Sequence, residues 1–315
     1  MPVNSDAPAI ETISLTKKYG SSPVNAVDSL NMIVHPGEIF GFLGPNGSGK
    51  TTTIKLLLDL IRPTSGSARM LGMDCNESSL KIRDRIGYLP GELKLYSNTP
   101  GDKIIKLFAS LRSTEVSQAY VKYLCQQLDA NIDGPVGKLS QGNRQKVGLI
   151  LALMSKPDIL ILDEPTTGLD PIAKHKVLGL LTEAQSEGRT VFFSSHALPD
   201  VEQICDRVGI IRTGRLQAVE QVQDLRSKKV HRIRINFSEP ISLDVFNSLS
   251  GVRSLPSEGN SVYLEVAGDL DAVIKVASQY MVESVQSEQP SLEEVFMSYY
   301  EDSSTDRTDT DGLHA

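Results

Sequence analysis

Residues 39–51 have the sequence IFGFLGPNGSGKT, in which a short apolar run leads directly into a glycine-rich loop. The apolar run Ile39 to Leu43 predicts a buried β-strand. The loop and Lys50-Thr51 match the pattern G-x-x-x-x-G-K-[ST]. Residues Thr52 to Ile61 predict a helix that ends before Arg62-Pro63. A strand, a glycine-rich loop and a helix in this order indicate a phosphate-binding site in an α/β domain.

The loop predicts how phosphate is held. Its glycines let consecutive backbone N–H groups turn towards phosphate oxygens, and the dipole of the following helix adds positive potential. Lys50 can reach the β- and γ-phosphates of a nucleotide, and the Thr51 hydroxyl can bind Mg²⁺. An ordinary glycine-rich turn is the alternative, which the position between a strand and a helix disfavours. The residues predicted to contact the nucleotide here are Gly44, Pro45, Asn46, Gly47, Ser48, Gly49, Lys50, Thr51 and Thr52.

A second apolar run, Ile159 to Leu162, is followed by the carboxylates of Asp163 and Glu164. Ligands of parallel sheets bind at the carboxyl ends of the strands. We therefore expect Asp163 to join Thr51 as a Mg²⁺ ligand. Glu164 can take a proton from an attacking water or polarise it. A pair of surface acids after a strand is the alternative, but it leaves the phosphate loop without the metal carboxylate that such loops require.

Four further segments follow the same order as motifs of a known family: Leu15 to Gly20, Leu139-Ser-Gln-Gly-Asn143, Asp163 to Asp170, and Ser194-Ser195-His196. Together they resemble the ATP-binding cassette family over about residues 8–220. The second segment resembles the family signature, usually LSGGQ, and the last resembles its switch histidine. The resemblance implies a P-loop NTPase of α/β class, with a mostly parallel sheet, an inserted helical subdomain and ATP hydrolysis.

The resemblance also implies roles for particular residues. Tyr19 stands where the family stacks an aromatic ring on adenine, and Asp170 is included among the nucleotide-contacting residues. Ser140 and Gly142 would grip the γ-phosphate held by a second subunit, so that two nucleotides lie within a head-to-tail homodimer. His196 would hydrogen-bond the γ-phosphate and act with Lys50 and Glu164 in catalysis. ATP and Mg²⁺ are the expected cofactors, and a transmembrane permease subunit is the expected partner.

The chain departs from the family pattern at two places. Gly91, followed by Glu92, stands where the family usually carries a glutamine that contacts Mg²⁺ and water. Glu92, a water or a different loop geometry are the alternatives for that role. In the signature, Gln141 replaces the first glycine and Asn143 replaces the glutamine, whereas Ser140 and Gly142 are retained.

Composition limits where the protein acts. The net charge of the 315 residues is −7, which argues against a broad surface for nucleic acid. Cys75, Cys125 and Cys205 stand far apart in the sequence and in no metal-ligand spacing. This arrangement fits free thiols in a reducing cytoplasm. The N-terminus lacks the pattern of a signal peptide, and no apolar stretch reaches the roughly 18 residues that cross a bilayer. We expect a cytoplasmic protein attached to the inner face of the membrane through its partner.

The pattern changes after Gln221. Residues 1–220 are expected to form the ATPase domain, with its helical subdomain at about 75–155. Residues 221–300 suggest a small α+β domain of β-α-β-β-α-β order, ending in a helix opened by Ser291. This part resembles the accessory domain of drug-export ATPases and favours export. Residues 301–315 hold five acids and one arginine, and are expected to be a disordered tail.

Two other functions remain alternatives. A non-transport cassette protein acting on nucleic acid or ribosomes would carry a long coiled coil or a second cassette, and this sequence shows neither. A P-loop kinase or GTPase has no need of the signature or the switch histidine. A transporter ATPase accounts for all the motifs.

Overall fold

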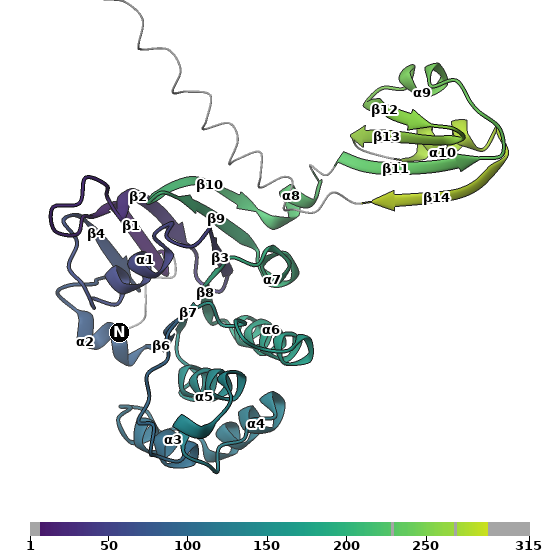
Figure 1. The fold of residues 1–315 in the computed structure, drawn as a ribbon. Helices are drawn as coiled ribbons and strands as arrows, with labels where there is room; N and C mark the ends of the chain where they lie inside the picture. The colour runs from purple at the N-terminus through teal and green to yellow at the C-terminus, as the bar shows by residue number, and fades with distance from the viewer. Residues whose placement is uncertain (1–6, 228–229, 268–269, 289–315) are drawn as a thin grey trace, which may run out of the picture. The chain divides into compact units, whose positions relative to one another are not determined.

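The computed structural model describes residues 7–227, 230–267 and 270–288 (Figure 1). Contacts between Cα atoms divide the chain into two compact units, Met1–Glu220 and Gln221–Ala315. The helix predicted to open at Ser291 and the tail 301–315 lie outside the described residues.

A six-stranded sheet forms the centre of the first unit, in the order β10-β9-β3-β8-β7-β6. Its pairs β9–β3, β3–β8, β8–β7 and β7–β6 are parallel. Every residue of β3, β7 and β8 is buried, which explains their continuous apolar sequences. The predicted α/β class with a largely parallel sheet is therefore confirmed. The strands are β3 (Ile39–Leu43), β6 (Ile86–Leu89), β7 (Ile159–Asp163), β8 (Thr190–Ser195), β9 (Arg207–Arg212) and β10 (Arg215–Gln221).

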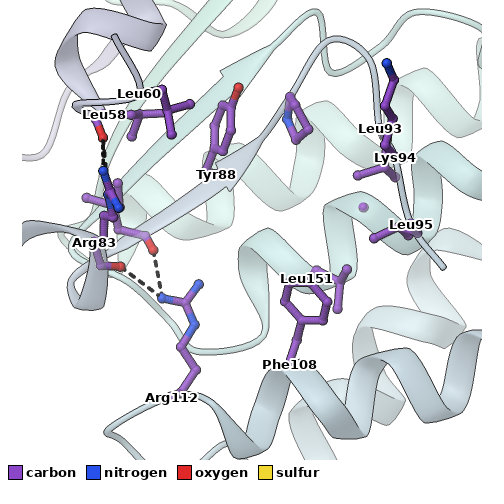
Figure 2. A pocket seen from close by; sticks show the side chains of 13 residues that line it. Leu58, Leu60, Arg83, Tyr88, Leu93, Lys94, Leu95, Phe108, Arg112 and Leu151 are labelled. Atoms are coloured by element: carbon purple, nitrogen blue, oxygen red, sulfur yellow. Dashed lines mark hydrogen bonds between the residues drawn. The ribbon is translucent and has the colours of Figure 1, made fainter. Parts of the chain in front are cut away.

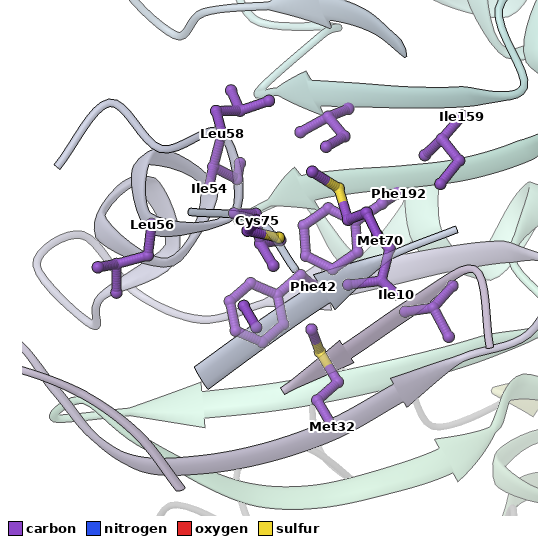
Figure 3. Close-up of a cluster of buried hydrophobic side chains, with 14 of the residues drawn as sticks. Ile10, Met32, Phe42, Ile54, Leu56, Leu58, Met70, Cys75, Ile159 and Phe192 are labelled. Atoms are coloured by element: carbon purple, nitrogen blue, oxygen red, sulfur yellow. The ribbon is translucent and has the colours of Figure 1, made fainter. Parts of the chain in front are cut away.

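A second, antiparallel sheet has the order β2-β1-β4-β5. Its strands are β1 (Ile10–Lys17), β2 (Val27–Val34), β4 (Ser65–Met70) and β5 (Met73–Asp74). Figure 3 shows side chains of both sheets meeting in one apolar cluster, with Ile10 and Met32 facing Phe42 and Phe192. The rings of Phe42 and Phe192 lie 5.4 Å apart between centroids. This core fixes β3, and with it the start of the phosphate loop.

The helices of the first unit are α1 (Lys50–Leu57), α2 (Ser79–Asp84), α3 (Gly101–Ser110), α4 (Gln118–Leu128), η1 (a 3₁₀ turn, Val136–Lys138), α5 (Gln141–Leu153), α6 (Pro171–Ser186) and α7 (Leu198–Ile204). Helix α1 begins two residues before the predicted Thr52 and ends before the predicted Ile61. Asp59 has a left-handed φ of 54°, which stops the helix without a proline. The predicted helical subdomain at 75–155 contains β6, a strand of the central sheet, so its helices α3, α4 and α5 lie within 101–153.

The second unit begins with α8 (Val222–Ser227) and continues as β11 (Val230–Phe237), α9 (Asp244–Asn247), β12 (Val252–Glu258), β13 (Ser261–Ala267), α10 (Asp271–Ala277) and β14 (Val282–Glu288). From β11 onward this is the β-α-β-β-α-β order that the sequence predicts. The strands form an antiparallel sheet of order β12-β13-β11-β14. Ile233, Ile235 and Phe237 of β11 are buried, because alternate residues of a strand face the covered side.

Candidate nucleotide-binding site

The phosphate loop joins β3 to α1 around a cavity of about 200 Å³. Ala26, Pro45 to Thr52 and Glu164 line this cavity. Gly49 has a φ of 111°, and a Cβ there would lie 2.5 Å from the carbonyl oxygen of Ala26. Only glycine fits this position, because both its backbone conformation and its close approach exclude a side chain. The cavity therefore brings together eight of the nine predicted loop residues, and Gly44 lies at its base beside Lys50.

Lys50 is almost buried, with 6% of its side chain exposed. Its Nζ donates to the carbonyl oxygens of Gly44 (2.7 Å) and Pro45 (3.3 Å) and lies 3.5 Å from Glu164 Oε1. Ser48 Oγ is buried in the same loop and has no hydrogen-bond partner among the described residues. A buried hydroxyl without a partner costs free energy unless a ligand completes it. An ammonium and an unsatisfied hydroxyl at one cavity suit the oxygens of a phosphate chain.

The two predicted Mg²⁺ ligands are in direct contact. Thr51 Oγ1 donates to Asp163 Oδ2 at 2.8 Å, and Ser194 Oγ donates to Asp163 Oδ1. The Asp163 side chain is buried at the carboxyl end of β7. In the described part of the chain, no three or more His, Cys, Asp or Glu side chains are grouped so that they could hold a metal ion by themselves. One hydroxyl and one carboxylate suit Mg²⁺, which takes its other oxygens from phosphates and water.

Glu164 connects the loop to His196. Its backbone has a left-handed φ of 53°, held by hydrogen bonds from its N–H to the backbone oxygen (3.2 Å) and Oγ (3.1 Å) of Ser194. This conformation directs the carboxylate towards the cavity, where Oε1 faces Lys50 and Oε2 lies 2.7 Å from His196 Nδ1. The three side chains predicted to be catalytic thus form one continuous line of contacts.

The signature segment opens α5. Ser140 is exposed, and its Oγ accepts a hydrogen bond from the N–H of Asn143 (3.2 Å), as an N-cap does. Gly142 packs close to the backbone of Gly168. The Asn143 side chain accepts from the backbone N–H of Asn131 (2.9 Å) and donates to its carbonyl oxygen. The departure at Asn143 therefore ties the helix to the preceding loop, and neither Ser140 nor Gly142 lines the loop cavity of its own chain.

Two further predicted residues also lie outside that cavity. Asp170 caps α6, where Oδ1 accepts from the N–H of Ala173 at 2.9 Å, and this donor lowers the pKa of the carboxyl group. Tyr19 follows β1, is 47% exposed, and its ring lies 5.3 Å from Lys17 Nζ. The carbonyl oxygen of Lys17 accepts from the N–H of Ala26, which lines the cavity. The role of Tyr19 therefore stays a prediction, whereas Asp170 has a local capping role.

Gln145 also contacts the site, although none of the predicted motifs contains it. This side chain of α5 is buried, and its Nε2 donates to the carbonyl oxygens of Glu164 and Pro165, both at 3.2 Å. The signal that marks it is a polar residue two positions before the apolar run that starts at Val147 of the same helix. Gln145 therefore joins the signature helix to the backbone of the predicted catalytic carboxylate.

Comparison with known proteins agrees with this geometry. Residues 27–167 match the ABC transporter family. The bacitracin transport ATP-binding protein BcrA of Bacillus licheniformis is 39% identical over 230 residues, covering 72% of this chain and 74% of that protein. The Nod factor export ATP-binding protein I of Cupriavidus metallidurans is 34% identical over 221 residues, covering 69% and 72%. A solved ATP-binding subunit of an ABC transporter superimposes with a TM-score of 0.63 at 28% identity, covering 69% of this chain and 92% of that one.

The chain belongs to the ABC transporter ATP-binding proteins. It binds and hydrolyses ATP as the ATPase subunit of a transporter. The relatives give no support to the nucleic-acid alternative. Among the described residues, no helix has the length and apolar character needed to span a bilayer.

Proposed function

We propose that this chain powers export through a separate transmembrane subunit, to which it is attached at the cytoplasmic face of the membrane. The observation that carries the proposal is the line of contacts from Lys50 through Glu164 to His196 at the mouth of the phosphate loop. The direction of transport rests on relatives named for export of Nod factors and transport of bacitracin.

The residues divide the work of hydrolysis between them. The loop N–H groups and Lys50 bind the phosphates, with Ser48 Oγ as a further donor. Thr51 and Asp163 hold Mg²⁺, which neutralises charge on the phosphate oxygens when it is bound. Glu164 orients the attacking water and accepts its proton, since its carboxylate lies at the cavity. His196 keeps that carboxylate in place through the 2.7 Å contact and faces solvent on its other side.

The site is completed by a second copy of the chain. Ser140 is exposed at the amino end of α5, where backbone N–H groups and the helix dipole attract anions. It does not reach the phosphate loop of its own chain. A head-to-tail homodimer places each Ser140 and Gly142 on the γ-phosphate of the other subunit, and Tyr19 against its own adenine.

The transmembrane subunit binds at the cavity shown in Figure 2. This cavity of about 360 Å³ has apolar walls from Leu58, Tyr88, Phe108 and Leu151, and cationic groups at Arg83, Lys94 and Arg112. Such walls suit a short segment with apolar and acidic side chains. Pro90 and Leu93 to Leu95 also line the cavity, and Gly91 lies against Asp163. A segment seated here is therefore linked to the proposed metal ligand through a few residues.

The test compares hydrolysis by the full chain and by variants of the site, with and without the membrane subunit. Glu164→Gln is expected to lower turnover by about 10²-fold or more, because a general base contributes at least this much. Lys50→Ala is expected to abolish tight ATP binding. Glu115→Gln, at an exposed side chain that lines neither cavity, is the matched control. Hydrolysis at the parental rate in Lys50→Ala would show that the site is misplaced.

A further inference from the structure

A polar cavity of about 410 Å³ lies at the amino ends of β6, β7 and β8. Its walls include Arg85, Lys156, Asp158, Glu187 and Arg189, and the segment Ala7 to Ala9. The nucleotide cavity lies at the other ends of the same strands, next to Asp163 and Glu164. The two cavities are therefore separate, and none of the nucleotide-contacting residues lines this one.

Arg189 has a buried guanidinium with unpaired donors, which indicates a ligand site. Its side chain is only 7% exposed, and its Nη2 donates to Glu187 Oε2 at 2.7 Å. Its Nε and Nη1 are buried and have no hydrogen-bond acceptor among the described residues. A buried cation with two unsatisfied donors is costly, so a native chain retains one where something completes it. The free N–H donors on Nε and Nη1 point from different edges of the planar guanidinium, so each can donate a charge-assisted hydrogen bond to an oxygen of a phosphate or carboxylate.

The surrounding charges favour an anion. Glu187 gives one oxygen to Lys156 Nζ (2.8 Å) and the other to Arg189, and these cations, Lys156 first, lower the pKa of its carboxyl group. Arg85 Nε donates to Asp158 Oδ2 at 2.8 Å. Three cationic side chains thus meet two carboxylates, and both Glu187 oxygens are already occupied. An incoming oxyanion meets an excess of positive charge.

We propose that this cavity binds a small oxyanion of the phosphate class, held by a free N–H donor of the Arg189 guanidinium with Lys156 and Arg85 beside it. A carboxylate offers the same chemistry, and the chain contains one nearby in sequence. Asp6, which lies outside the described residues, directly precedes Ala7 in the cavity wall. The experiment must therefore separate a free anion from the chain's own side chain.

Isothermal titration with inorganic phosphate, at an ionic strength held constant with NaCl, tests the proposal on the full chain. The Lys50→Ala background removes phosphate binding at the nucleotide loop. In this background Arg189→Met is expected to weaken phosphate binding at least about tenfold, the cost of losing a charged hydrogen bond. Arg62→Gln, at a side chain 66% exposed that does not line the cavity, is expected to change nothing.

Thermal melts check that each variant folds. If Arg189→Met fails to fold, the double variant Arg85→Gln/Lys156→Gln replaces it, since both side chains are partly exposed. Phosphate binding that appears only after Asp6→Asn would show that the chain's own carboxylate competes for the cavity, and it overturns the proposal of a free anion. Phosphate binding unchanged by Arg189→Met and by the double variant overturns the proposal. So does a lack of binding in both the background and its Asp6→Asn form.

Discussion

Gly91 occupies the space where the family usually places a glutamine, and the structure shows what a side chain there would meet. A Cβ at this position would lie 3.0 Å from Asp163 Oδ2. This is tighter than an ordinary van der Waals contact, so the carboxylate of the proposed metal ligand would have to shift. Glu92 does not take over easily, because its side chain is 81% exposed and pairs with Lys94 at 3.3 Å.

These contacts predict that substitution of Gly91 lowers hydrolysis, whereas substitution of Glu92 does not. Gly91→Ala is expected to lower the rate of hydrolysis severalfold, since sub-ångström displacement of a positioned group slows catalysis. Glu92→Ala is expected to leave both ATP binding and the turnover stimulated by the membrane subunit unchanged. Steady-state assays over a range of Mg²⁺ concentrations measure both. A clear loss of stimulated turnover in Glu92→Ala would instead assign the missing glutamine's role to Glu92.

Gln145 is a positioning residue by the same kind of argument. Its amide donates to the carbonyl oxygens of Glu164 and Pro165, where the chain turns out of β7 with the left-handed φ of Glu164. Gln145→Leu removes both donors at nearly constant volume. The Glu164 carbonyl keeps its hydrogen bond from the Thr167 N–H (3.2 Å), whereas the buried Pro165 carbonyl loses the partner it has among the described residues, at a cost of about 1–3 kcal/mol.

The expected result for Gln145→Leu is a lower kcat with little change in the affinity for ATP. A merely structural role would lower the melting temperature without this division between kcat and KM. Gln127→Leu, at an exposed position of α4, serves as the control. Equal losses in the two variants would show that Gln145 has no special part in placing Glu164.

At the scale of elements, the sequence pattern predicts a strand best when all residues of the strand are buried to the same degree. The strands β3, β7 and β8 are buried throughout, so their apolar runs mark them clearly. The antiparallel sheet was not recognised, because β1 and β2 are half exposed and irregular. Ser14 and Ser29 have left-handed φ values of 44° and 49°, and the register shifts between Thr12 and Leu15. Such bulges interrupt the alternation on which strand prediction depends.

The same limit explains the site. The local motifs identified Lys50, Thr51, Asp163 and Glu164, because each follows directly from a strand or a loop pattern. The contacts of Gln145 and Ser194 bring together segments that lie 19 and 31 residues apart, and the sequence pattern carries no record of them. The predicted carboxyl end of α1 is wrong because Asp59, rather than the proline, stops the helix.

The start of α5 provides a prediction for an element. The Asn143 N–H donates to the capping hydroxyl of Ser140, and the Asn143 side chain makes two hydrogen bonds with the backbone of Asn131, which we call the clamp on Asn131. Asn143→Gln restores the residue usual in the family but lengthens the side chain by one carbon, so the clamp on Asn131 is expected to loosen. Hydrogen exchange should speed up at the Asn131 amide, with exchange in the middle of α5 unchanged. Equal protection of this amide in the two proteins would contradict the clamp.

At the scale of the whole molecule, the proposed site is shared between two chains. Lys50, Glu164 and His196 converge in one chain, whereas Ser140 and Gly142 lie outside the cavity that they would complete. In the proposed dimer ATP would join the two copies, since each nucleotide would contact both. Hydrolysis would remove the γ-phosphate and with it the contact to the second chain, so we expect the chemical step to be coupled to separation of the dimer.

Glu164→Gln is expected to trap that dimer, because it removes the proposed base but keeps the shape of the site. Light scattering after size-exclusion chromatography should find this variant dimeric with ATP and Mg²⁺, and monomeric with ADP. Adding Ser140→Ala should weaken the dimer, and Ser140→Thr should largely preserve it, because threonine keeps a capping hydroxyl. The cap itself is worth only about 1 kcal/mol, so melting temperatures separate loss of the helix from loss of the contact. A Glu164→Gln chain that stays monomeric with ATP at high concentration, with the membrane subunit also present, would rule out the shared site.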